Sequence, residues 1–243
     1  MNSGPAQRFP TTAWSVIRAA QDHDGPEHLA AINRLMAAYW RPVFYFLRAR
    51  RYPLERAEDL TQDFFVAFYE RDWIRRADPE RGRFRTLLLT ILTRFLADQS
   101  DQRAPRQRVF DDRLVTISVL LGESDRNFEP PDNRTPEEVF MHEWARSVIA
   151  SVQQCLETWC SNRGRPDWYQ IFCQLYLPSP GSPHLSQQAL AEQLRLTRDQ
   201  VRYGLEEVNR QFVELLRAEV AGQVGSDENL DTEIRELERL LTA

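Results

Sequence analysis

Apolar side chains recur at three- and four-residue intervals along much of this chain, and this period constrains the fold more than any other feature. Leu60, Phe64 and Phe68 are spaced four apart and form one apolar stripe on a helix, with acidic and amide side chains off the stripe. The segment 83–96 is apolar around most of a helical circumference, which predicts a buried helix. We therefore expect an all-α protein.

Changes in this pattern divide the chain. Residues 8–108 carry the first set of helical patterns and predict one helical domain. Within it, Pro42 should kink or break a helix near Trp40, because proline lacks an N–H donor and clashes with the preceding turn. Residues 109–133 lose the periodicity and are rich in acidic side chains, which predicts an extended linker.

A capping box marks the start of the second helical domain, at residues 134–221. Thr135 and Glu138 stand three apart, and Pro136 occupies the first helical position, an arrangement that satisfies the free N–H groups of a helix start. Residues 222–243 form an acidic tail with one amphipathic segment. The sequence thus predicts two small helical domains joined by an acidic linker.

The second domain also contains the spacing of a helix-turn-helix. Ser186 can cap a short helix, and Thr197 with Gln200 forms another capping box that opens a longer helix. A short helix, a tight turn and a capped longer helix are typical of proteins that place a helix in the DNA major groove. Gly204 lies inside the longer helix, where it costs about 1 kcal/mol in helix propensity.

Charge is distributed unevenly along the chain. All 31 basic residues are arginine, a side chain suited to phosphate contacts. Residues 71–108 hold ten Arg against five acidic residues, whereas residues 219–243 hold seven acidic residues against two Arg. The net charge of −5 opposes nucleic-acid binding as a bulk effect, but the local arginine cluster favours it.

Several classes of function lack the residues that they need. No apolar run approaches the ~20 residues that span a bilayer, and the N-terminus lacks the apolar stretch of a secretory signal. Three cysteines and four histidines show no metal-ligand spacing, so we expect no metal, no cofactor and unreactive thiols in a reducing compartment. No nucleophile–base pair, paired-carboxylate site or phosphate-binding glycine loop is apparent, which argues against an enzyme.

The order of these motifs resembles that of a bacterial sigma factor. An acidic helix before an arginine-flanked one, followed by a second domain with a helix-turn-helix, is similar to regions 2 and 4 of the sigma-70 family. The closest resemblance is to its extracytoplasmic-function (ECF) group, and to a planctomycete-type subgroup within it. The resemblance covers nearly the whole chain and is carried by FPTTAWS at 9–15, YWRP at 39–42, EDLTQDFF at 58–65, DPERGRFR at 78–85 and TPEEVF at 135–140.

The resemblance implies a cytoplasmic promoter-specificity subunit whose partners are core RNA polymerase and promoter DNA. Docking on the β′ clamp helices would use Asp59, Gln62, Asp63 and Phe64, and region 4 would meet the β flap. The −10 element would be held as single-stranded DNA by Arg83, Phe84, Arg85, Arg94, Asp98, Arg103, Arg106 and Arg108, although core packing is the stronger expectation for Phe84. The linker would enter the polymerase cleft, and an anti-sigma factor or another regulatory protein is a further partner.

The −35 element would meet the start of the second helix of the helix-turn-helix, through Thr197, Arg198, Gln200, Arg202 and Tyr203. The sequence departs from the family pattern shortly afterwards. Glu206 and Glu207 stand where related helices carry basic residues, and each lost phosphate contact weakens binding to duplex DNA.

Three hypotheses therefore stay open at the level of sequence. The first is a promoter-specificity subunit that helps to melt the −10 region, with the acidic tail packed on region 4. The second is a sigma-like adaptor that docks on polymerase and uses region 4 to bind a regulatory or targeting protein. The third is a helical DNA-binding regulator that is independent of polymerase.

Overall fold

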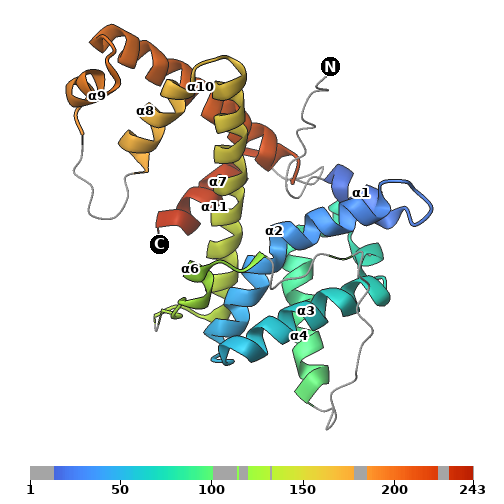
Figure 1. Ribbon diagram of the computed structural model, residues 1–243. Coiled ribbons are helices and arrows are strands. Elements are labelled where there is room, and N and C mark those ends of the chain that lie inside the picture. The colour runs from blue at the N-terminus through green and yellow to red at the C-terminus, as the bar shows by residue number, and fades with distance from the viewer. Residues whose placement is uncertain are drawn as a thin grey trace. The chain divides into compact units, whose positions relative to one another are not determined.

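The computed structural model describes residues 14–100, 114, 120–131, 133–177, 185–223 and 230–242 (Figure 1). The described residues form helices and no strand, which confirms the all-α expectation. They divide into two units: a large unit within residues 14–148 and 219–242, and a small unit within residues 149–218. None of the described helices combines the length and the apolar composition that crossing a membrane requires.

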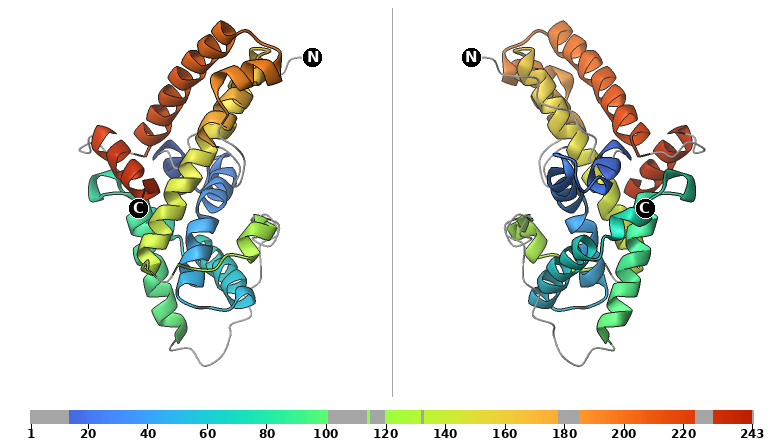
Figure 2. Two further views of the ribbon diagram at one scale, coloured as in Figure 1. Left: turned by 90° about the vertical axis from the view of Figure 1, so that its left-hand side faces the viewer. Right: turned by 90° about the vertical axis from the view of Figure 1, so that its right-hand side faces the viewer.

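Four helices pack together in the large unit (Figures 1 and 2). They are α1 (Trp14–Gln21), α2 (His28–Ala49), α3 (Leu54–Glu70) and α4 (Phe84–Ser100). Two 3-10 turns, η1 (Trp73–Arg76) and η2 (Pro79–Arg81), connect α3 to α4. The unit also contains α6 (Glu123–Arg126), the part of α7 (Pro136–Asn162) up to Val148, and α11 (Leu230–Thr242).

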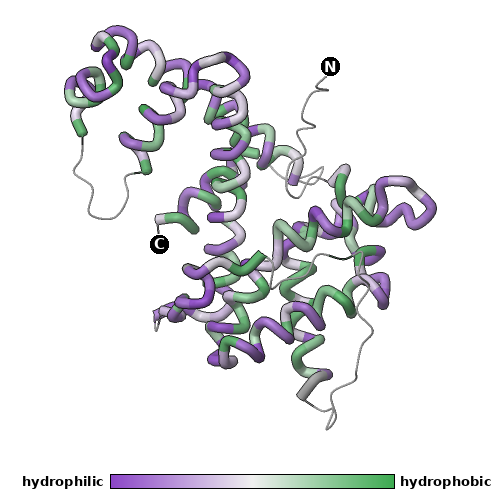
Figure 3. Tube along the Cα trace, viewed as in Figure 1, coloured by the Kyte–Doolittle hydropathy of each residue, from purple (hydrophilic) through white to green (hydrophobic). Residues whose placement is uncertain are grey.

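Aromatic rings form the centre of the large unit. The stripe expected on α3 is confirmed, because Leu60, Phe64 and Phe68 are all buried. The Phe64 ring centroid lies 5.6 Å from that of Phe95 on α4 and 6.3 Å from that of Trp73 on η1. Hydrophobic and hydrophilic segments follow one another along these helices (Figure 3), as expected for helices that bury one face.

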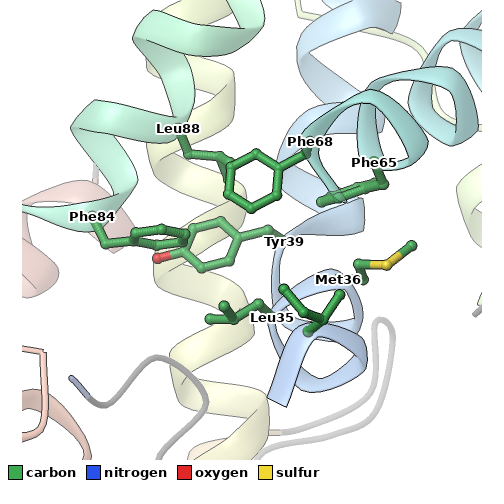
Figure 4. A pocket seen from close by; sticks show the side chains of 8 residues that line it. Leu35, Met36, Tyr39, Phe65, Phe68, Phe84 and Leu88 are labelled. Carbon is green, nitrogen blue, oxygen red and sulfur yellow. The ribbon is translucent and has the colours of Figure 1, made fainter. Parts of the chain in front are cut away.

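A small apolar cavity lies between α2, α3 and α4 (Figure 4). Its volume is about 10 Å³, the space of roughly one water molecule, so it is a packing defect of the core and holds no ligand. Its lining residues are Ile32, Leu35, Met36, Tyr39, Phe65, Phe68, Phe84 and Leu88.

Of the kink or break expected at Pro42, the break does not occur. α2 continues from His28 to Ala49 with Pro42 inside it. Proline removes one backbone hydrogen bond, but the neighbouring Tyr39, Trp40 and Phe44 side chains are buried in the core. Their burial offsets the missing bond, a tertiary effect that local propensity does not register.

Part of the expected linker is ordered on α2. Asp125 of α6 is buried and accepts hydrogen bonds from Tyr45 Oη at 2.9 Å and from the Gly122 backbone N–H at 2.9 Å. Arg41 Nη2 lies 3.2 Å from the same carboxylate, and the Phe128 ring lies 4.0 Å from that of Tyr45. Residues 122–128 are therefore a fixed part of the large unit and not an extended segment.

The boundary near residue 134 also differs from the expected one. Helix α7 begins at Pro136 with the predicted capping box: Thr135 N–H donates to Glu138 Oε2 at 2.8 Å and Glu138 N–H donates to Thr135 Oγ1 at 3.2 Å. However, α7 belongs to the large unit as far as Val148, where the Phe140 ring packs on Phe46 of α2 at 6.5 Å. The first part of α7 belongs to the large unit because one of its faces is buried there. Residue spacing predicts that a helix has a buried face but does not say which element covers it.

The small unit contains the rest of α7, then α8 (Pro166–Tyr176), α9 (Gln187–Leu194) and α10 (Arg198–Ala221) as far as Ala218. One buried cluster joins α7, α8 and α10 and consists of Leu156, Trp159, Cys160, Trp168, Phe172 and Val208. A second cluster joins α8, α9 and α10 and consists of Ile171, Ala191 and Val201. These clusters pack α9 and α10, the two helices of the expected helix-turn-helix, against α8.

Candidate nucleic-acid and protein interfaces

The predicted docking residues lie on α3 but not all on its surface. Asp59 is exposed, and Gln62 and Asp63 are half-buried at the margin of the same face. Phe64 is fully buried in the aromatic core, so its prediction as a docking residue is wrong as a direct contact. Its spacing places it on the core stripe, where it fixes the helix that presents the acidic and amide side chains.

An arginine-lined cleft of about 820 Å³ lies beside the start of α4. It is bordered by η1, η2, α4 and Trp14 of α1, and it combines five arginines with one aspartate and two threonines. The polar lining residues are Arg75, Arg76, Asp78, Arg81, Arg83, Thr86, Thr90 and Arg94. Clustered guanidinium groups in a concave surface are suited to an extended polyanion such as a nucleic-acid strand.

The connection between α3 and α4 is held by specific bonds. Gln21 Nε2 of α1 donates to the carbonyls of Ile74 at 3.0 Å and Ala77 at 2.8 Å. Asp78 caps η2 by accepting from Glu80 N–H at 3.0 Å. Gly82 then has φ 116°, a conformation that favours glycine, and it turns the chain into α4.

Ion pairs orient two of the cleft arginines. Arg75 pairs with Asp72, and Arg81 Nε lies 3.3 Å from Asp78 Oδ2. Arg75, Arg76 and Arg81 are all exposed. The sequence charge count included these three arginines but did not select them as binding residues, because the resemblance placed the site from Arg83 onward.

The exposed face of α4 completes the cleft. Thr86, Thr90 and Arg94 stand four apart on one side of the helix, and Thr90 Oγ1 donates to the Thr86 carbonyl at 2.8 Å. Asp98 is also exposed. Phe84 is buried and packs on Phe68 of α3 and Tyr39 of α2, as core packing predicted. Residues 103, 106 and 108 lie outside the described part of the chain.

Arg83 and Arg85 are engaged by the C-terminal helix. Arg83 Nη2 lies 2.8 Å from Glu233 Oε2 of α11, and its Nη1 donates to Glu236 Oε2. Arg85 is 2% exposed, with Nη1 2.5 Å from Glu233 Oε1 and its Cζ 3.9 Å from the Trp144 ring centroid. In this arrangement Arg85 is not accessible to DNA. The acidic tail was expected on region 4, and that expectation is wrong for α11, which belongs to the large unit.

The caps predicted for α9 and α10 are present. Ser186 Oγ accepts from Ala189 N–H at 3.2 Å, and Thr197 and Gln200 exchange bonds of 2.8 and 3.2 Å at the start of α10. The turn between the helices uses Arg195 in the left-handed region, with φ 56°. The first turns of α10 expose all five predicted −35 residues: Thr197, Arg198, Gln200, Arg202 and Tyr203.

Acidic residues lower the positive charge of α10. Arg202 Nη2 lies 3.1 Å from Asp199 Oδ1, and Arg210 pairs with Glu207. Glu206 is exposed. These pairs offset part of the positive charge that contacts to duplex phosphates would use.

A comparison with known families identifies the central part of the large unit. Residues 35–105 match the family model of sigma-70 region 2. This segment covers most of α2, all of α3 and α4, and every polar residue that lines the arginine cleft. The match supports a sigma-70 family member. No curated protein and no solved structure matches the chain.

Proposed function

We propose that this protein is an RNA polymerase sigma factor of the ECF type, which brings core polymerase to specific promoters and assists melting of the −10 element. The observation that carries the proposal is the arginine-lined cleft inside the sigma-70 region 2 segment. A sigma factor acts in the cytoplasm with polymerase and promoter DNA and catalyses no reaction of its own.

The large unit carries two surfaces of opposite charge, which favours one binding protein and the other binding nucleic acid. Asp59, Gln62 and Asp63 offer acidic and amide groups suited to an arginine-rich partner such as the β′ clamp helices. The cleft offers guanidinium groups to single-stranded DNA, where Arg76 and Arg94 track phosphates beside Thr86 and Thr90. The acidic and basic surfaces are thus suited to protein and to nucleic acid, respectively.

The start of α10 is the proposed −35 reader. Its exposed arginine and glutamine side chains have the donor groups that read base edges in the major groove, and the capped helix N-terminus favours a phosphate. Since its arginines are offset by Asp199 and Glu207, we propose that region 2 contributes most of the DNA affinity.

Run-off transcription tests the proposal. The protein, core polymerase from its own organism and DNA upstream of its gene should give a discrete transcript. Asp63→Arg should weaken core binding at least ~10-fold by placing like charges together, whereas Glu214→Arg, a charge reversal at an exposed position on α10, should not. No transcript despite intact core binding would refute promoter recognition and favour the adaptor hypothesis.

A DNA-binding measurement tests the cleft directly. Arg76→Ala and Arg94→Ala should each weaken binding to single-stranded −10 DNA and reduce the salt slope by about 0.7. Arg217→Ala, at an exposed position on α10, is the matched control. Equal losses in all three variants would mean that the cleft has no special role.

A further inference from the structure

We infer that α11 is an internal acidic ligand of the arginine cleft, which holds Arg83 and Arg85 and competes with nucleic-acid phosphate for them. This inference rests on the proposed function, because it assigns a regulator to the same DNA-binding surface. The helix would lower DNA affinity while docked and release the two arginines when a polyanion displaces it.

Arg83 belongs to both the cleft and the α11 contact. It lines the cleft with Arg76 and Arg94, and its guanidinium group pairs with Glu233 at 2.8 Å and with Glu236. The two terminal nitrogens of Arg83 thus each face a carboxylate of α11. A phosphate group seeks the same nitrogens with the same geometry, so the two contacts exclude each other.

Arg85 is covered more completely. Its Nη1 lies 2.5 Å from Glu233 Oε1 and its Nη2 lies 3.6 Å from Glu236 Oε1, while the Trp144 ring packs against the guanidinium group. The two arginines and two glutamates balance in formal charge. Removal of α11 would therefore add two positive charges beside a cleft that already carries exposed arginines.

The contact has features of a releasable one. Within the described residues, Arg85 Nε and Nη2 have no hydrogen-bond partner, and the two Glu233 oxygens meet Arg85 Nη1 and Arg83 Nη2 as ion pairs at 2.5 and 2.8 Å without hydrogen-bond geometry. Buried charges that are incompletely hydrogen-bonded lose much of their pairing energy to desolvation. Leu237 is the one fully buried apolar side chain of α11 among the described residues, and Leu230, Ile234 and Leu240 are only half-buried.

Release would also unfold the helix. α11 has 13 residues, a length at which an isolated helix is marginal in water. Its backbone hydrogen bonds therefore depend on docking. The rate at which its amide hydrogens exchange with solvent reports the fraction of molecules in which α11 is docked. A nucleic-acid strand offers closely spaced phosphates and can replace both glutamates at once.

The first experiment compares two full-length variants that each remove one negative charge from α11. Glu233→Gln weakens the contact with both arginines, whereas Glu238→Gln changes an exposed side chain and is the control. Binding to a fluorescein-labelled oligothymidine is followed by anisotropy between low and moderate salt. For Glu233→Gln we expect affinity to rise about 5-fold at 0.1 M salt per released arginine, with a salt slope steeper by about 0.7 each. Equal affinity of Glu233→Gln, Glu238→Gln and the wild type would overturn the inference.

The second experiment uses the unaltered protein, so that a folding defect cannot obscure the result. Hydrogen exchange of the α11 amides is measured with and without saturating oligothymidine. We expect faster exchange in α11 on binding, while α2 and α3 are unchanged. Unchanged or slower exchange in α11, with DNA bound, would show that the helix stays docked.

Parallel measurements of core-polymerase binding and run-off transcription separate the two proposals. If the wild type and both variants bind oligothymidine and initiate equally, the inference about α11 is wrong and the proposed function stands. If none binds DNA or initiates, the proposed function is wrong and the inference fails with it. If Glu233→Gln alone gains affinity and the protein initiates transcription, both stand; the same gain without a transcript would refute promoter recognition and leave α11 as a competitor for the arginines.

Discussion

Replacement of Gly204 by alanine should destabilise the protein, although helix propensity alone predicts the opposite. Gly204 lies inside α10, where alanine is more favourable by about 1 kcal/mol. A Cβ atom added at this position would stand 2.6 Å from Trp168 Cδ1 and 2.8 Å from its Nε1. Both distances are well inside van der Waals contact, so the indole ring must move.

The Trp168 ring has little room to move. It is 5% exposed and lies 6.0 Å from the Trp159 ring, with the Arg165 guanidinium group at 4.5 Å and the Tyr203 ring at 5.9 Å. Overpacking of a core site costs about 1–3 kcal/mol. After the propensity gain is subtracted, we expect Gly204→Ala to lower the free energy of unfolding by about 1 kcal/mol.

Urea unfolding monitored by tryptophan fluorescence provides the measurement. Glu214→Ala, at an exposed position of α10, is the control for an alanine that makes no new steric contact. Trp168→Phe removes part of the ring that the new Cβ would meet, so Gly204→Ala should cost less in that background. A Gly204→Ala variant that is more stable than the wild type by about 1 kcal/mol would refute the steric explanation.

Three further predictions concern single buried or capping groups. Asp125→Ala should lower the free energy of unfolding by about 3 kcal/mol, because it leaves the buried Tyr45 hydroxyl and the Arg41 guanidinium group without their carboxylate. A cost below ~1 kcal/mol would show that α6 is only loosely packed. Ser186→Ala should cost about 1 kcal/mol by removal of the α9 cap, and Ser186→Asp should restore it; equal losses in both variants would contradict the capping role. Burial raises the pKa of the Cys160 thiol to about 11, so its thiolate is scarce at pH 8. A disulfide reagent should therefore label Cys160 more than ~100-fold slower in the native than in the unfolded protein, with native rates rising towards pH 11. Fast labelling of the native protein would refute this burial.

Local features of the fold could be predicted from the sequence. The capping boxes at Thr135 and Thr197 form the bonds that their spacing indicated, because such bonds involve residues three apart and need no distant partner. The helical stripe on α3 and the arginine cluster were also visible, since period and charge are properties of the sequence itself. Position on a helical face explains why Asp59 is exposed.

Other features depend on residues far apart in the sequence and could not be predicted from it. Phe64 was expected at the docking surface and Arg85 at DNA, yet both are buried, because burial depends on which element packs against a given face. Helix α2 continues through Pro42 because surrounding aromatic contacts outweigh one lost hydrogen bond.

The acidic tail shows most clearly what the sequence determined and what only the tertiary structure decided. Its sequence determined an amphipathic helix with acidic residues, and residues 71–108 determined an arginine cluster. Only the tertiary structure paired Glu233 and Glu236 with Arg83 and Arg85, which stand about 150 positions earlier, as the separation of 153 between Arg83 and Glu236 illustrates. Opposite charge permits many such pairings along a chain, and the packing of Leu237 and Trp144 in the large unit selects this one.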